Sequence, residues 1–358
     1  MYIILMAGGV GTRFWPMSRK TRPKQLLHIV GTKSMLRLTY ERIATLVKPE
    51  QVLVITNQDQ KSQIVKQLPE VPVENIIAEP SGLNTAPCVA LASAIVSARG
   101  NDREVMVVLP ADHLVADAEN FQRTIQIGAK YAAKNECLLT LGIHPRSPES
   151  GYGYIQMNKK IFEQEGKEFY HVKTFAEKPN LETAVLFLKS GDFLWNSGIF
   201  IWSVQSIIQA FQEHLPELGI DLIKIREAVG QANFAEVVND VYSRTKSVSI
   251  DYGIMEVAKK VCVLKANFDW NDLGSWEAVY NISPGDSHGN VVHSKEHVLI
   301  NAKNNYFYSQ KKLIAAVNIE GLIVVEMDDA LLICKKEDSQ EVKAVVDQLS
   351  RKGMSSYL

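Results

Sequence analysis

The sequence predicts an α/β fold with a doubly wound, mostly parallel sheet, followed by a small β-rich module. Three observations predict it. Short apolar runs alternate with helical patterns in the first part of the chain, and a glycine-rich turn follows the first apolar run directly. Short strand-like segments then recur at close intervals near the end of the chain. Strand–helix alternation is typical of parallel sheets, and closely spaced strands are typical of all-β modules.

The first half alternates strands and helices. Buried strands are predicted at residues 2–6, 51–56, 75–78, 105–109 and 137–141. Helices are predicted between them at residues 35–46, 58–68, 86–98 and 121–133. Such strands are joined by right-handed crossovers, and ligands bind at their carboxyl ends. Motifs that follow a strand directly are therefore the candidates for a site.

The second half begins with an inserted α+β segment. Paired strands are predicted at 151–157 and 169–175, followed by an apolar run at 195–202 and one helical stretch from 204 to about 229. The loop Ser283-Pro-Gly-Asp286 predicts a boundary between a catalytic domain, residues 1–285, and a module, residues 286–358. Strands are predicted in the module at 298–302, 305–308, 314–317, 322–327 and 331–335, without an internal repeat.

The last predicted element is an amphipathic helix. Its apolar face is formed at helical spacing by Val342, Val345, Val346 and Leu349. Asp338 and Glu341 lie three residues apart before this face, which predicts a capping box.

Composition narrows the function classes. The 358 residues are 46% hydrophobic and 22% charged, which indicates a globular protein with an ample core. A net charge of −1 gives no global attraction for nucleic acid or an anionic membrane. Four scattered cysteines without a CxxC pair argue against a disulfide framework or a zinc site, and no apolar run reaches the roughly 18 residues of a membrane span. We therefore expect a cytoplasmic protein that binds anions through local cations.

The turn after the first strand, MAGGVGTR, gives the strongest local signal. Its glycines let the backbone approach a phosphate and point N–H groups at it. No Gly-Lys-Ser/Thr closes it as in a Walker A loop, and Phe14 occupies the last glycine position of the dinucleotide fingerprint. The glycines alone fit a plain tight turn equally well. Cations on both sides, Arg13, Arg19 and Lys24, favour a triphosphate.

Residues 8–25, GGVGTRFWPMSRKTRPKQ, resemble the signature of nucleoside-diphosphate-sugar pyrophosphorylases, and the Phe-Trp-Pro and Pro-Lys-Gln steps are similar to the mannose-1-phosphate guanylyltransferase branch. Further blocks follow in the family's order: Glu79-Pro80, Asn84-Thr85-Ala86-Pro87, Pro110-Ala111-Asp112-His113, Gly151-Tyr152-Gly153-Tyr154, Phe175-Ala176-Glu177-Lys178-Pro179, Trp195-Asn196-Ser197-Gly198, Ser249-Ile250-Asp251-Tyr252 and Asp272-Leu273-Gly274-Ser275-Trp276. Leu83 departs from the Arg or Lys frequent in the family, so no charged nucleotide contact is expected there.

The resemblance implies a Rossmann-like, nucleotide-diphospho-sugar transferase fold and a reaction. GTP and α-D-mannose 1-phosphate would condense to GDP-mannose and pyrophosphate, by in-line attack of the sugar phosphate on the α-phosphorus. No protein nucleophile is needed, because the attacking phosphate oxygen is already charged. Arg13 would neutralise the leaving phosphates and Lys24 the α-phosphoryl oxygens, Lys178 would hold the attacking phosphate, and Asp112 completes the catalytic set.

The resemblance also implies the binding residues. The nucleotide contacts are Ala7, Gly8, Gly9, Gly11, Thr12, Arg13, Lys24, Glu79, Pro80, Asn84, Thr85 and Asp112. The sugar-phosphate contacts are Gly153, Glu177, Lys178 and Asn196. Asp112 and Asp272 would hold Mg²⁺, since two carboxylates with phosphate oxygens form the hard oxygen-rich site that Mg²⁺ prefers.

Structural interpretations stand beside these roles. A lone Asp after a strand, such as Asp112, more often caps a helix, and Asn84 is a natural N-cap. An exposed Glu177–Lys178 pair is usually solvated, and Asn196 suits a turn before a glycine. His113 is expected at a helix start without a metal role. Most tryptophans are expected in the core.

Two other functions stay open. The same reaction could use another nucleoside triphosphate and sugar 1-phosphate, or the chain could be a non-catalytic sugar-nucleotide sensor. A glycosyltransferase is disfavoured because no Asp-x-Asp follows a strand. Residues 286–358 are too few for the isomerase cupin of longer relatives, so no fused phosphomannose isomerase is expected. The resemblance implies a homodimer, and the net charge argues against a nucleic-acid or membrane partner.

Overall fold

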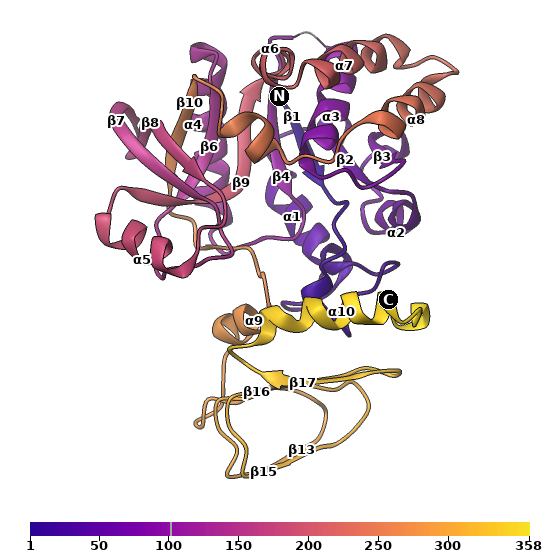
Figure 1. Cartoon of the computed structure of the whole chain (residues 1–358), viewed down its shortest axis with the longest axis vertical. Helices are drawn as coiled ribbons and strands as arrows, with labels where there is room; N and C mark the ends of the chain where they lie inside the picture. Colours follow the sequence, from indigo (N-terminus) through magenta and orange to yellow (C-terminus); the bar gives the residue numbers. More distant parts are fainter. Residues whose placement is uncertain (101) are drawn as a thin grey trace. The chain divides into compact units, whose positions relative to one another are not determined.

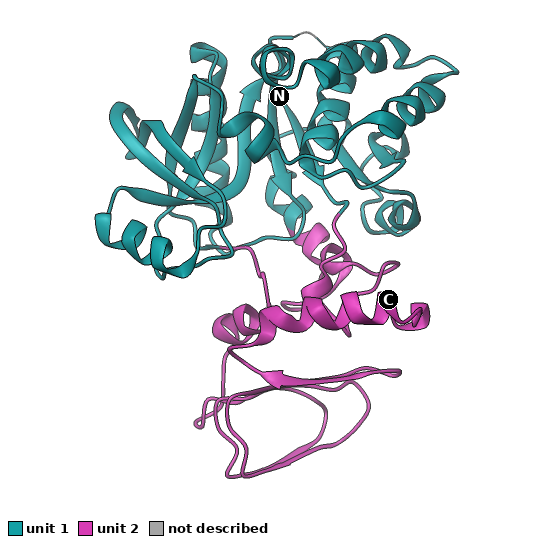
Figure 2. Cartoon of the chain, viewed as in Figure 1, with its two compact units in different colours: residues 1–8, 39–270 teal, residues 9–38, 271–358 magenta. Residues whose placement is uncertain are grey.

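The computed structural model describes residues 1–100 and 102–358 (Figure 1). Contacts divide the chain into two compact units that do not follow sequence order (Figure 2). Unit 1 consists of Met1–Gly8 and Thr39–Trp270, and unit 2 of Gly9–Leu38 and Asn271–Leu358. The glycine-rich turn from Gly9 onward therefore belongs to the same compact unit as the end of the chain, and the domain boundary predicted at residue 285 stays a prediction.

Unit 1 is built on a nine-stranded sheet of order β3-β2-β1-β4-β9-β6-β10-β8-β7. Its strands are β1 (Tyr2–Met6), β2 (Val52–Asn57), β3 (Ile76–Glu79), β4 (Val105–Pro110), β6 (Leu138–Ile143), β7 (Tyr154–Gln164), β8 (Lys167–Ala176), β9 (Phe193–Ser203) and β10 (Val261–Ala266). The strands β1 to β4 pair in parallel, as do β6 and β10. The inserted strands β7, β8 and β9 pair antiparallel, and β7 begins at Tyr154, later than predicted. The predicted α/β sheet is confirmed, and its antiparallel part comes from the insertion.

Helices connect these strands. They are α1 (Met35–Ile43), α2 (Gln58–Gln67), α3 (Thr85–Arg99), α4 (Ala118–Asn135), α5 (Leu181–Ser190), α6 (Val204–His214), α7 (Pro216–Ala228) and α8 (Phe234–Arg244); the short strands are β5 (Leu114–Val115) and β11 (Trp270–Asn271). The single helix predicted from 204 to 229 is wrong. Pro216 has no N–H to continue the ladder of α6 and instead takes the first position of α7, where a proline is tolerated.

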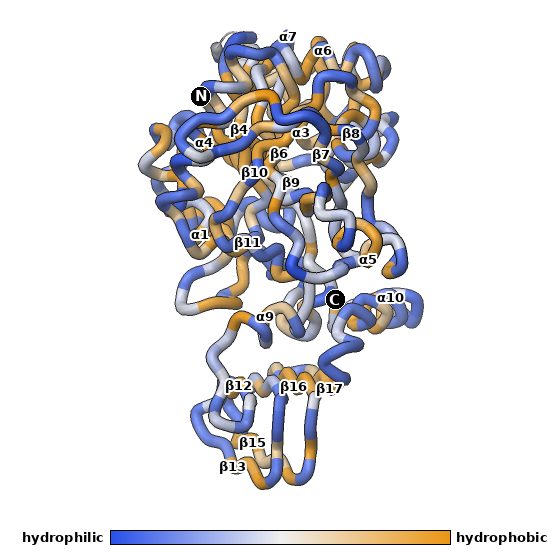
Figure 3. Tube along the Cα trace, turned by 90° about the vertical axis from the view of Figure 1, so that its left-hand side faces the viewer, coloured by the Kyte–Doolittle hydropathy of each residue, from blue (hydrophilic) through white to orange (hydrophobic). Residues whose placement is uncertain are grey.

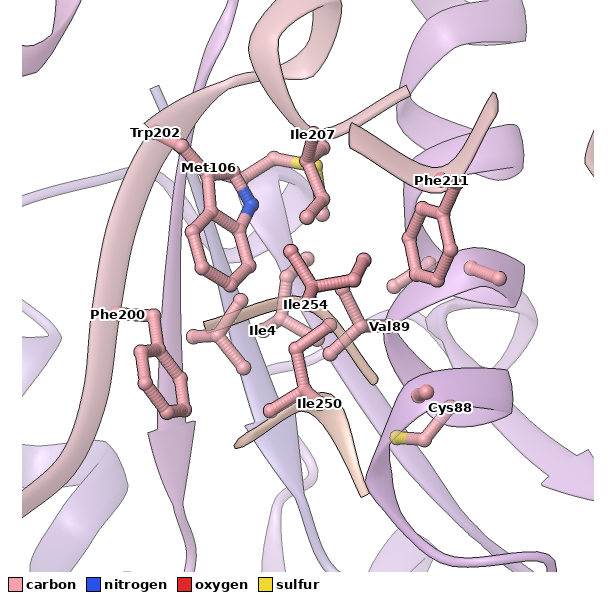
Figure 4. Close-up of a cluster of buried hydrophobic side chains, with 14 of the residues drawn as sticks. Ile4, Cys88, Val89, Met106, Phe200, Trp202, Ile207, Phe211, Ile250 and Ile254 are labelled. Carbon is pink, nitrogen blue, oxygen red and sulfur yellow. The ribbon is translucent and has the colours of Figure 1, made fainter. Parts of the chain in front are cut away.

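The core of unit 1 gathers around α3, whose residues from Ala86 to Ser97 are buried on every side. Figure 4 shows part of this cluster, with Val89 of α3, Met106 of β4 and Trp202 of β9 among the side chains. Trp195, Trp202, Trp270 and Trp276 are each at most 9% exposed, as predicted for core residues. The four cysteines carry free thiols. Within the described residues, no helix combines the length and apolar character that crossing a bilayer requires.

The end of the chain forms a β-coil in unit 2. Its strands are β12 (Val291–His293), β13 (His297–Ile300), β14 (Tyr306–Tyr308), β15 (Ile314–Val317), β16 (Leu322–Glu326) and β17 (Leu331–Lys335), and its helices are α9 (Trp276–Ile282) and α10 (Val342–Arg351). Strands β12, β14 and β16 stack in parallel, β13 stacks on β15, and β17 closes the coil antiparallel. Figure 3 shows hydrophobic and hydrophilic residues alternating along it.

The prediction that this region lacks a repeat is wrong. Tyr306 pairs with Val291 on one side and with Ile323 on the other, so each turn of the coil takes about 15–17 residues. The sequence signal is weak because few side chains repeat between turns. Those that do include Asn290 and Asn305, which stack in adjacent turns with an amide-to-amide hydrogen bond of 3.0 Å.

The predicted capping box at the last helix is also wrong. A 3-10 turn, Ser339–Glu341, precedes α10, and neither Asp338 nor Glu341 makes a side-chain capping bond. The amphipathic helix itself is present but begins at Val342, because the 3-10 turn takes the positions that the box would occupy.

Asn305 should be a stability determinant of the β-coil. Its fully buried amide donates to the carbonyl of Ile319 at 3.2 Å and accepts from the Leu322 N–H at 2.9 Å. Asn305→Ala removes the side-chain acceptor of the Leu322 N–H and the amide donor to Asn290, while the Ile319 carbonyl keeps the Lys303 N–H at 3.0 Å, so the free energy of unfolding should fall by about 2–4 kcal/mol in urea titrations. Asn301→Gly is the control, because Asn301 is exposed and has a φ of 50° that glycine accepts. Its change should stay below about 1 kcal/mol; equal losses would contradict the prediction.

Candidate active site

The glycine-rich turn is shaped by its contacts within unit 2. Gly11 has a φ of 68°, in the left-handed region, and a Cβ there would overlap the Cβ of Lys24. Ser18 Oγ donates to the Gly11 carbonyl at 2.8 Å, and Gln25 Nε2 donates to the Gly9 carbonyl at 2.9 Å. Glycine is therefore required at position 11 for both conformation and space.

The two cations of the turn have different environments. Arg13 lies in the 3-10 turn Thr12–Phe14, is exposed, and forms no hydrogen bond or ion pair with any residue that the structure describes. Lys24 is only 5% exposed; its Nζ donates to the Asp272 carbonyl and lies 5.6 Å from the centre of the Phe14 ring. Arg13 is free to meet an anion, whereas Lys24 is fixed in place beside the Asp272 turn.

Asp272 lies in a tight turn of unit 2. Its Oδ1 accepts from the Gly274 N–H at 3.0 Å, and Leu273 between them has a φ of 48°. A Cβ on Gly274 would come within 2.9 Å of the carboxylate. The Asp-x-Gly spacing therefore holds this half-buried carboxylate in one orientation.

In unit 1, Glu79 at the carboxyl end of β3 lies close to Gly8, which follows the carboxyl end of β1. Asn57 of β2 pairs with Glu79 of β3, and Asn57 Nδ2 lies 3.4 Å from the Gly8 carbonyl. A Cβ on Gly8 would lie 3.3 Å from Glu79 Oε2, and Tyr242 Oη donates to Glu79 Oε1 at 2.8 Å. The start of the glycine turn therefore lies directly against a buried carboxylate.

Burial raises the pKa of Glu79 to about 7, against an ordinary value of 4.5, although the Tyr242 hydrogen bond opposes the rise. The folded protein then binds this proton more tightly than the unfolded chain does. The resulting stabilisation is complete below the unfolded pKa and is lost as the pH rises through about 7.

Thermal unfolding should reveal this linkage. From pH 5 to pH 8, the wild type should lose on the order of 2 kcal/mol relative to Glu79→Gln, which keeps an acceptor for Tyr242 but does not titrate. Parallel stability profiles for the two proteins would contradict a raised pKa at Glu79.

Asp112 follows β4 in a turn that unit 1 holds from several sides. The Ala111 N–H donates to the Met6 carbonyl at 3.1 Å, which ties the turn to the end of β1. Arg42 of α1 donates to the His113 carbonyl at 3.2 Å, and the Trp270 indole donates to His113 Nδ1 at 3.2 Å. The expectation that His113 begins a helix is wrong, because β5 follows it. Asp112 is thus placed at the same sheet edge as Gly8 and Glu79.

Asn84 and Thr85 lie at the start of α3. The Asn84 side chain accepts from the Thr85 N–H at 2.9 Å with a φ of 71°, so its predicted capping role is confirmed. Thr85 Oγ1 accepts from the Ile250 N–H at 2.8 Å. Pro80 and Asn84 are exposed at the two ends of the loop between β3 and α3, and their nucleotide contacts stay predictions.

The four predicted sugar-phosphate residues come together in unit 1. The Asn196 N–H donates to the Gly153 carbonyl at 2.8 Å, and a Cβ on Gly153 would overlap Glu177 Oε2. Lys178 Nζ lies 2.8 Å from Glu177 Oε1, with the lysine 59% exposed and the glutamate 11% exposed. Gly153 therefore makes room for a carboxylate whose lysine partner faces solvent.

Asp251 belongs to this cluster and was not predicted as a site residue. Its Oδ1 accepts from Asn196 Nδ2 at 2.8 Å. Burial, and then the charge of Glu177, raise its pKa to about 6. The signal available in the sequence is the Ser-Ile-Asp-Tyr block at 249–252, which no strand or glycine turn marks as functional. A carboxylate whose pKa is raised by burial and by a second carboxylate is typical of a functional site.

Asp112 and Asp272, the two predicted metal ligands, fit a hard divalent cation only when a substrate supplies further oxygen ligands. Among the described residues, no group of three or more His, Cys, Asp or Glu side chains could hold a metal ion. Asp112 belongs to unit 1 and Asp272 to unit 2, so their pairing on one cation stays a prediction. Single carboxylates completed by phosphate oxygens and water are the arrangement that Mg²⁺ uses with nucleotides.

Comparison with known proteins places these features in a wider group. Residues 2–288 match the model of a family described as nucleotidyl transferase, and residues 295–349 match a MannoseP isomerase/GMP-like beta-helix domain. The second match agrees with the parallel stacking of the β-coil.

Similar proteins extend over nearly the whole chain. A mannose-1-phosphate guanylyltransferase of Klebsiella pneumoniae is 36% identical over 99% of this chain and 75% of its own length. One from Salmonella montevideo is 38% identical, with the same coverage of both chains. The crystal structure of a "mannose-1-phosphate geranyltransferase" from Thermus thermophilus superposes with a TM-score of 0.86 at 32% identity, over 98% of this chain and 99% of that one.

Proposed function

This chain belongs to the nucleotidyl transferase family, and on that premise we propose that it is an enzyme that joins GTP and mannose 1-phosphate into GDP-mannose and pyrophosphate. The names of its relatives support the two substrates. The observation that carries the proposal is the presence in unit 1 of two separate polar groups: Gly8, Glu79 and Asp112 at the strand ends, and the Gly153–Glu177–Lys178–Asn196–Asp251 cluster. A two-substrate transfer needs both.

On the nucleotide side, the turn from Gly8 to Thr12 presents backbone N–H groups to the phosphates, while the Ala7 N–H donates to the Ile55 carbonyl. The exposed guanidinium of Arg13 neutralises the leaving β- and γ-phosphates, and Lys24 neutralises the α-phosphoryl oxygens. Glu79, buried beside Gly8, faces the nucleoside together with Pro80, Asn84 and Thr85. These roles need no covalent chemistry from the protein.

On the sugar side, Lys178 holds the phosphate whose oxygen attacks the α-phosphorus. Glu177 accepts hydrogen bonds from the sugar hydroxyls, and Asn196 both donates and accepts them. The Gly153 backbone lies against the sugar, and its missing Cβ leaves room for the Glu177 carboxylate. When both substrates are bound, the attacking sugar-phosphate oxygen lies in line with the α-phosphorus and the leaving pyrophosphate. The reaction between two anions then proceeds within one complex and does not depend on their encounter in solution.

Enzymes of this family generally use a divalent cation, and we propose Mg²⁺ with Asp112 and Asp272 as its protein ligands. When bound, the cation supplies charge neutralisation and orients the phosphates. Cytoplasmic location, a homodimer, and the absence of nucleic-acid and membrane partners are also proposals.

Pyrophosphate release from a matrix of substrates tests the function. Five nucleoside triphosphates are each paired with mannose, glucose, galactose and N-acetylglucosamine 1-phosphates. We expect GTP with mannose 1-phosphate to give the highest kcat/KM. Preference for another pair would replace the substrates but keep the reaction, and no release with any pair would favour the sugar-nucleotide sensor.

A further inference from the structure

The glycine-turn segment Gly9–Leu38 and the C-terminal segment Asn271–Leu358 form one compact unit although they are far apart in the sequence. We propose that the C-terminal segment positions the loop of residues 9–26, which carries Arg13. The positioning residues are Trp15, Arg19, Asp329 and Tyr357. The inference rests on the proposed function, because the loop's contact with a triphosphate is what gives its position a role in the reaction.

Trp15 is held from two sides by the C-terminal segment. Its indole Nε1 donates to the Tyr357 carbonyl at 2.9 Å. The indole Nε1 of Trp276 donates in turn to the Trp15 carbonyl at 3.2 Å. Trp15 is only 8% exposed and lies two residues after Arg13. Both its ring and its backbone are therefore fixed by residues of the C-terminal segment.

Arg19 forms the second connection. Its Nη2 lies 2.9 Å from Asp329 Oδ1, in the turn between β16 and β17. The same guanidinium donates to the carbonyls of Pro16 and Ser18 and lies 5.6 Å from the centre of the Trp15 ring. Arg19, which the sequence suggested as a phosphate ligand, is thus used to fasten the loop to the β-coil.

Helix α10 provides the third connection. It contacts the 3-10 turn Thr12–Phe14 that carries Arg13. Between them lies a small cavity of about 160 Å³, lined by Val10, Thr12 and Trp15 on the loop and by Val346, Asp347 and Ser350 on α10. The loop and α10 therefore face each other across a narrow gap.

The loop needs this support because it has little structure of its own. Its regular elements are the two three-residue turns Thr12–Phe14 and Lys24–Leu26, and turns of this length have weak internal hydrogen bonding. A phosphate-binding loop that is already ordered loses less entropy on binding, which increases affinity without any new ligand contact. The β-coil is thereby part of the nucleotide site, although none of its strands needs to touch the nucleotide.

The test compares Trp15→Phe and Asp329→Asn, singly and combined, with two matched controls. Trp202→Phe removes a buried indole N–H that has no partner among the described residues. Asp328→Asn neutralises the neighbouring aspartate, which pairs with Lys311 within the β-coil. Each protein is measured by hydrogen exchange of amides 9–19, by isothermal titration with GTP, and by KM for each substrate.

We expect KM for GTP to rise about two- to fivefold in each single variant and about tenfold in the double variant. Exchange of amides 9–19 should rise in parallel, while KM for mannose 1-phosphate and both controls stay near wild type. Unchanged exchange in the double variant overturns the inference, and so does faster exchange with unchanged GTP affinity. Failure of the proposed function is seen separately, because the wild type would then show no turnover. In that case hydrogen exchange of amides 9–19 and isothermal titration with GTP still test the inference.

Discussion

Lys24→Met should lower kcat by about 10²–10³-fold while the protein remains folded. Methionine keeps the length of the side chain beside Phe14, but it removes the charge that we assign to the α-phosphoryl oxygens. Loss of one preorganised charged contact in a transition state typically costs a few kcal/mol, which corresponds to this factor. Single-turnover pyrophosphate release measures the chemical step, and thermal unfolding checks the fold.

Lys20→Met is the matched control for this variant. Lys20 lies in the same segment and is exposed, so its replacement should leave kcat within about twofold. If Lys24→Met retained near-wild-type kcat, Lys24 would be a structural residue that only supports the Asp272 turn. Equal losses in both variants would point to general damage of the loop.

Asp112→Asn should lower kcat/KM by about 10²–10³-fold and raise the Mg²⁺ concentration that gives half-maximal activity. The amide keeps the size of the side chain and the turn that Arg42 and Trp270 support, but it is a poor ligand for a hard cation. Pyrophosphate release across a Mg²⁺ series measures both effects, and isothermal titration of Mg²⁺ into the nucleotide complex provides a readout independent of turnover.

Asp269→Asn is the control for Asp112. Asp269 is 66% exposed, pairs with Arg146, and has a φ of 49° that asparagine tolerates. Its replacement should change neither the rate nor the Mg²⁺ requirement. Normal Mg²⁺ dependence in Asp112→Asn would contradict the role of Asp112 as a cation ligand.

Much of unit 1 could be predicted from the sequence, because its signals are local. A buried strand with parallel neighbours on both sides, such as β1, shows as a continuous apolar run, and the residues at the end of a strand follow such a run directly. That rule places Asp112, whereas Glu79 is expected from the family resemblance. The split between α6 and α7 was also visible in principle, since a proline inside a helical pattern marks a boundary.

The rest depends on contacts between distant residues. Asp251 joins the cluster of Gly153, Glu177, Lys178 and Asn196 only because Asn196, distant in sequence, donates a hydrogen bond to it. Arg19 carries the charge expected of a phosphate ligand, and its use in holding the loop is decided by Asp329, far along the chain. The turns of the β-coil repeat in backbone position while most side chains differ, so Asn290 and Asn305 form a ladder that hydrophobic periodicity does not reveal.

The composition of unit 2 has a consequence for how the chain is made. Its first segment ends at Leu38, and the next begins at Asn271. At ribosomal rates of about 5–20 residues per second, roughly 10–50 s pass after the first segment is made before synthesis of its partner segment begins. Until then Phe14, Trp15 and Leu26, which are buried in the finished protein, have no packing partners from the C-terminal segment. Slowing or pausing translation before residue 271 should therefore prolong the exposure of this aromatic segment.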